Sequence, residues 1–313
     1  MEMEYRQLGK SGLRVSAIGL GTNQFGGKVD QAGVNRIIDG ALDLGINLID
    51  TADTYTKGQS EETLGVALRG KWERVVLATK VHGKTGEGPN DWGTSRYHIM
   101  NGLEASLRRL QTDHIDLYQM HRFDATTPME ETLRTLDDLV RAGKVRYIGA
   151  SNYAAWQLAQ ANMLAELRGY TPFVSIQNHY HMLERDLERE MIPYCNAANV
   201  GILPYFPLAG GFLTGKYKRG EAAPAGSRGE QSPYVQRYMV DANYDKVEKL
   251  ESWAKERGHS MAEQAHAWLL AQPQVSSVIS GATRLEQVQS NAAAAGWQLT
   301  PDEYNEVNTV LDA

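Results

Sequence analysis

The sequence contains a single cysteine, Cys195, and no long apolar run. One cysteine excludes an intramolecular disulfide, and its helix-like surroundings are typical of a buried small side chain. No apolar run approaches the roughly 20 residues that a membrane-spanning helix needs. The charged start of the chain, MEMEYRQLGKSG, lacks the apolar core of a signal peptide. We therefore expect a cytoplasmic protein with no membrane partner.

An excess of basic residues is also missing. The chain carries 32 Lys and Arg against 38 Asp and Glu, which gives a net charge of −6. Nucleic-acid binders usually present a basic surface, so this balance argues against a nucleic-acid partner. The sequence also lacks the Cys/His spacing of a zinc site and the loop of an EF-hand, so no metal is expected.

What the sequence does contain is an alternation of short apolar runs and amphipathic stretches. Helical spacing of apolar residues predicts helices in segments 31–44, 60–68, 97–110, 129–141, 154–168 and 262–271. The apolar runs predict eight strands, in segments 17–20, 46–50, 75–80, 114–120, 146–150, 173–177, 202–205 and 277–279. Repeated strand–helix units imply parallel strands. Eight of them in 313 residues favour the α/β class and a (β/α)8 TIM barrel, with residues 1–313 as one domain.

Three segments fall outside this alternation. Segment 5–16 has the pattern of an N-terminal β-hairpin, which would close the floor of the barrel. Segment 210–243, after the seventh strand, is rich in Gly, Pro and charge, and loops of this length in compact domains are usually functional or disordered. Segment 300–311 predicts a closing helix, with Thr300 as its cap and Pro301 at its first position.

Polar residues stand where the predicted strands end. Asp50 ends the second strand and Tyr55 follows it, Lys80 ends the third strand, and His121 follows the fourth. Each residue by itself has an ordinary structural explanation, such as a turn, a surface lysine or a satisfied histidine. In a (β/α)8 barrel, however, the active site lies at the carboxyl ends of the strands. Four titratable groups on that rim indicate a functional site.

The chemistry of these four side chains is complementary. A phenol with a pKa of about 10 is a poor acid at neutral pH, and a nearby ammonium lowers that pKa. Asp50 can hold Lys80 beside Tyr55, and His121 can donate to a substrate oxygen. This set suits protonation of a carbonyl oxygen. Side chains do not donate hydride, so the sequence implies a nicotinamide cofactor.

At these residues the chain resembles the aldo-keto reductase superfamily over nearly its full length. The stretches that carry the resemblance occur in the expected order: GINLIDTADTYTKGQSEETLG, ATK, DLYQMH, YIGASNY, IQNHY, PYFPLAGGFLTGKY and GATRLEQVQSN. The long loop after PLAGG is similar to the branch with bacterial stress-type reductases and potassium-channel β subunits. The resemblance implies reduction of a small aldehyde or ketone with NADPH. It also implies a catalytic tetrad with Tyr55 as general acid, formed by Asp50, Tyr55, Lys80 and His121.

The resemblance further implies the cofactor contacts. The aromatic ring of Tyr205 would stack on the nicotinamide. Gly281 stands where other members have a lysine for the 2′-phosphate, and Lys216, Arg228 and Arg284 would supply positive charge instead. NADPH is therefore expected, and NADH stays open. The implied contacts are Gly21, Thr22, Asn23, Asp50, Ser151, Asn152, Gln177, Tyr205, Phe206, Pro207, Leu208, Ala209, Gly210, Lys216, Arg228, Gly281, Ala282, Thr283, Arg284, Gln287 and Asn291.

Two rival functions stay open. The chain could be an NADPH-binding regulatory subunit with slow turnover, or an aldolase with Lys80 as a Schiff-base lysine. The substrate, the direction of the reaction and the oligomeric state, a homo-oligomer included, are also open. Trp92, Tyr97 and Phe123 follow the third and fourth strands, where they would either line an apolar pocket or pack in the core.

Overall fold

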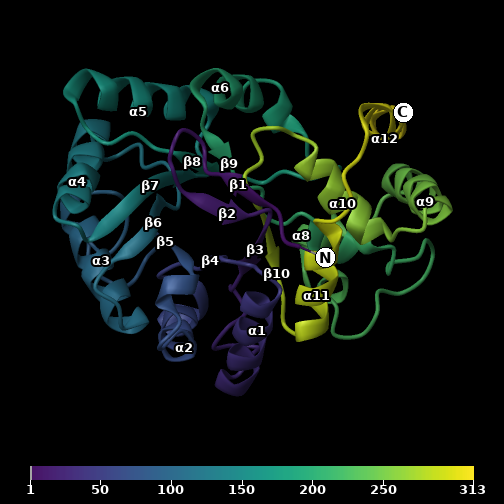
Figure 1. Ribbon diagram of the computed structural model, residues 1–313, viewed down its shortest axis with the longest axis horizontal. Coiled ribbons are helices and arrows are strands. Elements are labelled where there is room, and N and C mark those ends of the chain that lie inside the picture. The colour runs from purple at the N-terminus through teal and green to yellow at the C-terminus, as the bar shows by residue number, and fades with distance from the viewer. Residues whose placement is uncertain (1) are drawn as a thin grey trace.

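The computed structural model describes residues 2–313, and it contains an eight-stranded parallel sheet (Figure 1). The strand order is β10-β3-β4-β5-β6-β7-β8-β9. The strands are β3 (Ile18–Gly21), β4 (Leu48–Asp50), β5 (Val76–Val81), β6 (Ile115–Met120), β7 (Val145–Ser151), β8 (Ser175–Gln177), β9 (Gly201–Ile202) and β10 (Val278–Gly281). Backbone hydrogen bonds from Ile202 to Gln274 (2.7 Å) and from Ile279 to Pro204 (2.8 Å) join the two edge strands. The sheet therefore closes, and the predicted (β/α)8 barrel is confirmed.

The helices form a ring around this sheet (Figure 1). The longer ones are α1 (Gln31–Asp43), α2 (Gln59–Ala67), α3 (Arg96–Leu110), α4 (Met129–Arg141), α5 (Ala155–Arg168), α6 (Met191–Ala198), α9 (Asp241–Glu256), α10 (Met261–Leu270), α11 (Leu285–Ala294) and α12 (Pro301–Asp312). The helices cover the outer face of the sheet, and the inner face lines the packed interior of the barrel. Every residue of β5 and β6 is therefore buried. Side chains also cap the helices, as in the reciprocal Thr300–Glu303 box that starts α12.

Two sequence predictions differ from the structure. The seventh strand is β9 and ends at Ile202, whereas the apolar run predicted a strand to residue 205. Pro204 has no N–H and cannot continue the hydrogen-bond ladder, so Tyr205 forms only isolated bridges to His179 and Ile279. The long loop after β9 also contains short helices that its Gly- and Pro-rich composition did not predict: η4 (Ala209–Thr214), α7 (Arg228–Gln231) and α8 (Pro233–Gln236).

The N-terminal hairpin closes the amino end of the barrel, as the sequence predicts. Its strands β1 (Tyr5–Gln7) and β2 (Arg14–Ser16) pair antiparallel and lie across the barrel strands (Figure 1). Leu8 and Val15 are fully buried in one apolar cluster with barrel residues that include Leu48, Val76 and Leu117. The hairpin thus supplies the apolar layer that keeps water out of this end.

We predict that Leu8→Ala lowers the free energy of unfolding by about 2–4 kcal/mol, because it removes a buried side chain and leaves a cavity under the barrel. Urea denaturation measures the change. The matched control is Lys10→Ala at the exposed turn of the hairpin, which should change stability by less than about 0.5 kcal/mol. Equal effects of the two substitutions would contradict the role of the hairpin as a plug.

Candidate active site

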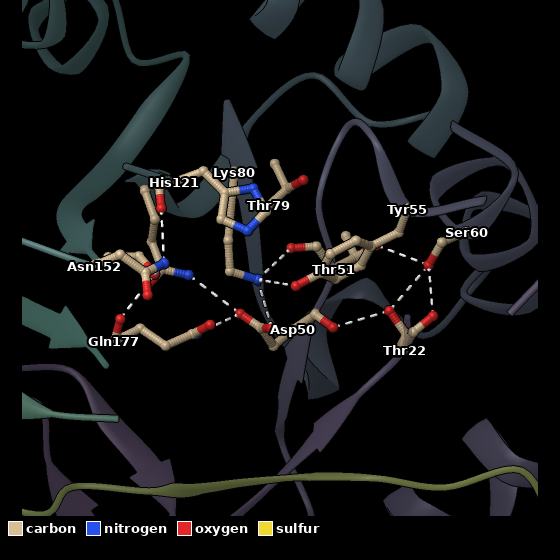
Figure 2. A network of polar contacts seen from close by, with 12 residues as sticks. Thr22, Asp50, Thr51, Tyr55, Ser60, Thr79, Lys80, His121, Asn152 and Gln177 are labelled. Carbon is tan, nitrogen blue, oxygen red and sulfur yellow. Dashed lines mark hydrogen bonds and ion pairs between the residues drawn. The ribbon is translucent and has the colours of Figure 1, made fainter. Parts of the chain in front are cut away.

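The carboxyl ends of the strands bring the four predicted catalytic side chains together. Asp50 is the last residue of β4, Lys80 lies one residue before the end of β5, and His121 follows β6. Tyr55 opens the short helix η1 (Tyr55–Gly58) after β4. Figure 2 shows these side chains converging on one polar network. They lie at the base of a cleft of about 570 Å³.

Lys80 is the centre of this network. Its side chain is fully buried, and its Nζ donates to Asp50 Oδ2 (2.6 Å), to the Thr51 carbonyl (2.8 Å) and to the Tyr55 hydroxyl oxygen (3.2 Å). An ammonium has three N–H donors, so all three are used. Tyr55 accepts from Lys80, and its own hydroxyl proton therefore stays free to be donated into the cleft.

Asp50 is held from its other side. Gln177 donates to Asp50 Oδ1 (2.8 Å), and Gln119 donates to the same oxygen (3.2 Å). The Asp50 backbone carbonyl accepts from the Thr22 hydroxyl (2.9 Å). The buried carboxylate thus has partners from three strands, β5, β6 and β8, which fix the direction in which it presents Oδ2 to Lys80 (Figure 2).

The electrostatics include an effect of burial that the sequence prediction did not. Burial raises the pKa of Tyr55 by more than Lys80 lowers it, so the lowering by Lys80 is present, as predicted, but the net pKa is raised. Burial by itself would lower the pKa of Lys80, but the Asp50 carboxylate outweighs it and the pKa is raised. Burial and the Lys80 charge lower the pKa of His121 to about 3. At neutral pH, Tyr55 is a phenol, Lys80 an ammonium and His121 a neutral imidazole.

Asn152 connects His121 to the aromatic wall of the cleft. It adopts a left-handed backbone conformation, with φ of 55°. Its Nδ2 donates to the His121 carbonyl (3.0 Å), and its Oδ1 accepts from the Tyr205 hydroxyl (2.9 Å). One face of the Tyr205 ring stacks on His179, with centroids 5.4 Å apart and an interplanar angle of 15°. Tyr205 also lines the cleft, so it presents a braced aromatic ring there.

The loop after Tyr205 has an unusual backbone. Phe206 and Ala209 have φ of 64° and 47°, and Gly210 and Gly211 are also positive. Residues other than glycine rarely adopt positive φ, and backbone strain of this kind concentrates at functional sites. A Cβ at Gly211 would lie 2.6 Å from the Lys216 Nζ, so glycine is what lets this ammonium approach the loop.

Most of the predicted cofactor contacts line the cleft, but three do not. Ala209 is fully buried, Asn291 is nearly so, and Arg284 is exposed outside the lining. The sequence reasoning also missed lining residues: Gln24, Lys28, Arg122, Gly211, Thr214, Gly226, Ser227, Ile279 and Ser280. Of these, Arg122 directly follows His121 and Lys28 lies in the loop after β3, so their position after strands was a signal available in the sequence.

The three aromatic residues considered for the substrate pocket lie outside the lining of this cleft. Phe123 packs edge-on against Tyr153 and Trp156. Trp92 packs edge-on against His82, and Tyr97 is 61% exposed. The core-packing interpretation therefore holds for Phe123.

A second carboxyl group lies behind the tetrad. Asp53 is only 3% exposed, and neither of its carboxyl oxygens has a hydrogen-bond partner among the described residues 2–313. Its neighbour Glu61 is paired with Arg109 (2.6 Å) and accepts from Thr79 (2.6 Å). Burial and the nearby Glu61 raise the pKa of Asp53 to about 7. No sequence signal marks this group, because the stretch DTADTY also fits an ordinary polar loop.

A cleft with buried titratable groups at the carboxyl end of a (β/α)8 barrel is the arrangement of an enzyme. The protein belongs to the aldo/keto reductase family, whose model matches residues 17–312. This result confirms the resemblance and the oxidoreductase class. None of the helices in the described residues 2–313 is long and apolar enough to cross a membrane.

Individual relatives align over almost the whole chain. The chain is 39% identical to an uncharacterized oxidoreductase, YrpG, of Bacillus subtilis (strain 168), covering 99% of this chain and 96% of the relative. It is 38% identical to a probable voltage-gated potassium channel subunit beta of Oryza sativa subsp. japonica, with 99% and 97% covered. It is 35% identical to versiconal hemiacetal acetate reductase of Aspergillus parasiticus, with 96% and 95% covered.

We predict that Asp53→Asn stabilises the protein at pH 8 and much less at pH 5. A carboxyl whose pKa is raised on folding costs stability as pH rises from about 4 towards about 7, because the folded state resists its ionisation. The amide cannot ionise, so we expect a gain on the order of 1–3 kcal/mol at pH 8 relative to pH 5. Urea denaturation at the two pH values measures it. The control is Asp43→Asn at an exposed site, and parallel pH dependence in both variants would refute the assignment.

Proposed function

We propose that the protein reduces small aldehydes or ketones to alcohols with NADPH, and that Tyr55 is the general acid. The observation that carries this proposal is the contact from Lys80 Nζ to the Tyr55 hydroxyl oxygen (3.2 Å). It leaves the Tyr55 proton available on the side of the cleft. The core contains buried residues from Met3 to Leu311, which supports the further proposal that the whole chain acts as one domain.

The cleft fits a dinucleotide. Its volume of about 570 Å³ is in the range of cofactor sites. Of the described residues that line it, Asp50 is the only acid, and Lys80 neutralises that acid. Lys28, Lys216 and Arg228 also line the cleft, and they can bind phosphate oxygens. The Arg228 guanidinium lies over the Phe206 ring, 5.7 Å from its centroid, so aromatic packing holds this cation at the loop.

Two groups could donate a proton to the carbonyl oxygen, and the electrostatics favour Tyr55. His121 is a neutral imidazole with a pKa of about 3, so at neutral pH it can donate a hydrogen bond but carries no readily released proton. Its ring lies edge-on to Tyr55 with centroids 5.8 Å apart, and both side chains line the cleft. We therefore assign His121 to orienting the carbonyl oxygen and Tyr55 to protonating it.

When bound, the nicotinamide would supply the hydride. The ring of Tyr205, held by His179 and Asn152, would stack on it. As the carbonyl oxygen gains negative charge, Tyr55 gives it a proton and becomes a phenolate. The Lys80 ammonium stabilises that phenolate, because its third N–H already points at the oxygen. Asp50 keeps Lys80 charged and in place. The fixed positions of these groups avoid reorganisation during the reaction.

The Schiff-base alternative has little support. A nucleophilic lysine must lose its proton, which requires a lowered pKa. The Asp50 carboxylate raises the pKa of Lys80, and all three of its N–H groups are engaged. The regulatory-subunit alternative is favoured by one observation, the 38% identity to a probable potassium channel subunit beta. A measured turnover number separates a slow cofactor-bound subunit from a reductase.

We predict that Tyr55→Phe reduces kcat at least 1,000-fold and leaves the affinity for NADPH within about threefold, because it removes the donated proton but keeps the ring. NADPH oxidation with an aldehyde panel and a fluorescence titration measure the two quantities. Tyr97→Phe is the matched control, since Tyr97 lies outside the lining of the cleft. Retained turnover in Tyr55→Phe would show that another group is the acid.

A second prediction concerns the choice of cofactor. We expect NADPH to bind at least tenfold more tightly than NADH, and Arg228→Gln to reduce that ratio, because the guanidinium pairs with the 2′-phosphate. Fluorescence titrations of the wild type and of Arg228→Gln with NADPH and with NADH measure the ratio of the two affinities. Arg134→Gln, an exposed residue of α4, is the control. Tighter binding of NADH would keep a nicotinamide site and overturn the roles given to Lys216 and Arg228.

A further inference from the structure

One cation of the cleft has no role in the proposed reaction. Arg122 lies immediately after His121 at the carboxyl end of β6, is exposed, and lines the cleft. Within the described residues 2–313 it has no ion-pair or side-chain hydrogen-bond partner. By contrast, Arg96 and Arg146, in the elements that flank β6, each donate to an aspartate. The Arg122 guanidinium is therefore available to something that enters the cleft.

The groups around Arg122 do not neutralise it. Its charge contributes to the lowered pKa values of His121 and His82, which burial chiefly lowers, so both imidazoles are neutral and neither offers it a negative charge. The charge of Arg122 also favours ionisation of the Tyr205 hydroxyl, but burial outweighs this effect and raises the pKa of Tyr205 to about 12. The nearby carboxylate of Asp124 keeps its charge, but its oxygens accept hydrogen bonds from Thr94, Thr126 and Thr127. Among the described residues, no carboxylate therefore forms an ion pair with the Arg122 guanidinium.

Arg122 is also separated from the cations assigned to the cofactor phosphates. Lys216 and Arg228 belong to the loop after β9, which lies beside β10 in the barrel. In the closed ring, β6 is the third strand from β9 in one direction and the fifth in the other, so it lies across the barrel from β9. A cofactor whose phosphates bind Lys216 and Arg228 would leave Arg122 uncovered beside His121. A substrate carbonyl has to reach Tyr55 and His121, which line the same cleft as Arg122.

We propose that Arg122 binds an anionic group of the substrate, and that the preferred substrates are carbonyl compounds with a carboxylate or phosphate a few bonds from the reacting carbon. This inference rests on the proposed reductase function and adds the substrate class to it. The planar guanidinium pairs with either oxyanion through two parallel hydrogen bonds. With the anion fixed at Arg122, the carbonyl oxygen is directed towards Tyr55 and His121.

The test compares matched carbonyl substrates with and without an anionic group. The carboxylate pair is 4-oxobutanoate and its methyl ester, and the phosphate pair is glyceraldehyde 3-phosphate and glyceraldehyde. Each is assayed with NADPH and the full chain as wild type, Arg122→Gln, Arg122→Lys and the control Arg134→Gln. We expect the wild type to prefer the anion of at least one pair by tenfold or more in kcat/KM. The pair with the larger preference identifies the oxyanion.

The variants identify the residue. Arg122→Gln should lower kcat/KM for the preferred anion at least tenfold more than for its neutral partner, mainly through KM, because the contact is made to a part of the substrate that does not react. Arg122→Lys should restore part of the loss, since it keeps the charge but not the planar fork. Added salt should raise KM for the anion, as the site is exposed to solvent.

Three outcomes separate this inference from the function on which it rests. If kcat/KM for the neutral carbonyls equals kcat/KM for their anionic partners, the proposed substrate class is overturned and the proposed reductase function stands. If the wild type prefers the anion but Arg122→Gln lowers kcat/KM equally for both members of the pair, the assignment of the anion contact to Arg122 is overturned. If no carbonyl is reduced and NADPH does not bind in the titration, the proposed function itself fails and this inference fails with it.

Discussion

The buried ion pair between Lys80 and Asp50 is the interaction on which the carboxyl end of the barrel depends. The two side chains are 0% and 3% exposed, and removing them from water costs several kcal/mol for each ion. That cost is offset only because every polar atom of the pair has a partner. Gln119 and Gln177 come from β6 and β8, so the pair joins four strands. Tyr55 is held by the same set of contacts, so the position of its hydroxyl follows from the packing of the barrel interior.

The barrel interior is divided between its two ends. The amino end is apolar and is closed by the hairpin residues Leu8 and Val15, whereas the carboxyl end holds the polar network and opens into the cleft. The apolar layer keeps water away from the underside of the ion pair, which strengthens the electrostatic effect of Lys80 on Tyr55. The geometry of the polar network and the stability of the barrel therefore rest on the same interior, which opens to solvent at the cleft.

Two aspartates three residues apart show how strongly the surroundings decide the state of a carboxyl group. Asp50 has partners on both oxygens, among them a lysine, and serves as the fixed counter-ion of the site. Asp53 has no partner on either oxygen among the described residues, and burial beside Glu61 raises its pKa to about 7. Within four consecutive residues, the structure therefore holds a carboxylate with partners on both oxygens and a carboxyl group that resists ionisation.

The sequence by itself determined the class of fold and the identity of the four central residues. Alternating apolar runs and helical periodicity require parallel strands and crossover helices, and this topology brings strand ends such as Asp50 and Lys80 to one rim. Tertiary structure alone decided the net rise of the Tyr55 pKa and, within residues 2–313, left the Asp53 carboxyl and the Arg122 guanidinium without a hydrogen-bond or ion-pair partner. These properties depend on burial and on which side chains from distant strands meet, and neither can be read from spacing along the chain. The exclusion of Arg284 from the cleft lining has the same reason, because the direction of a loop side chain is set by packing.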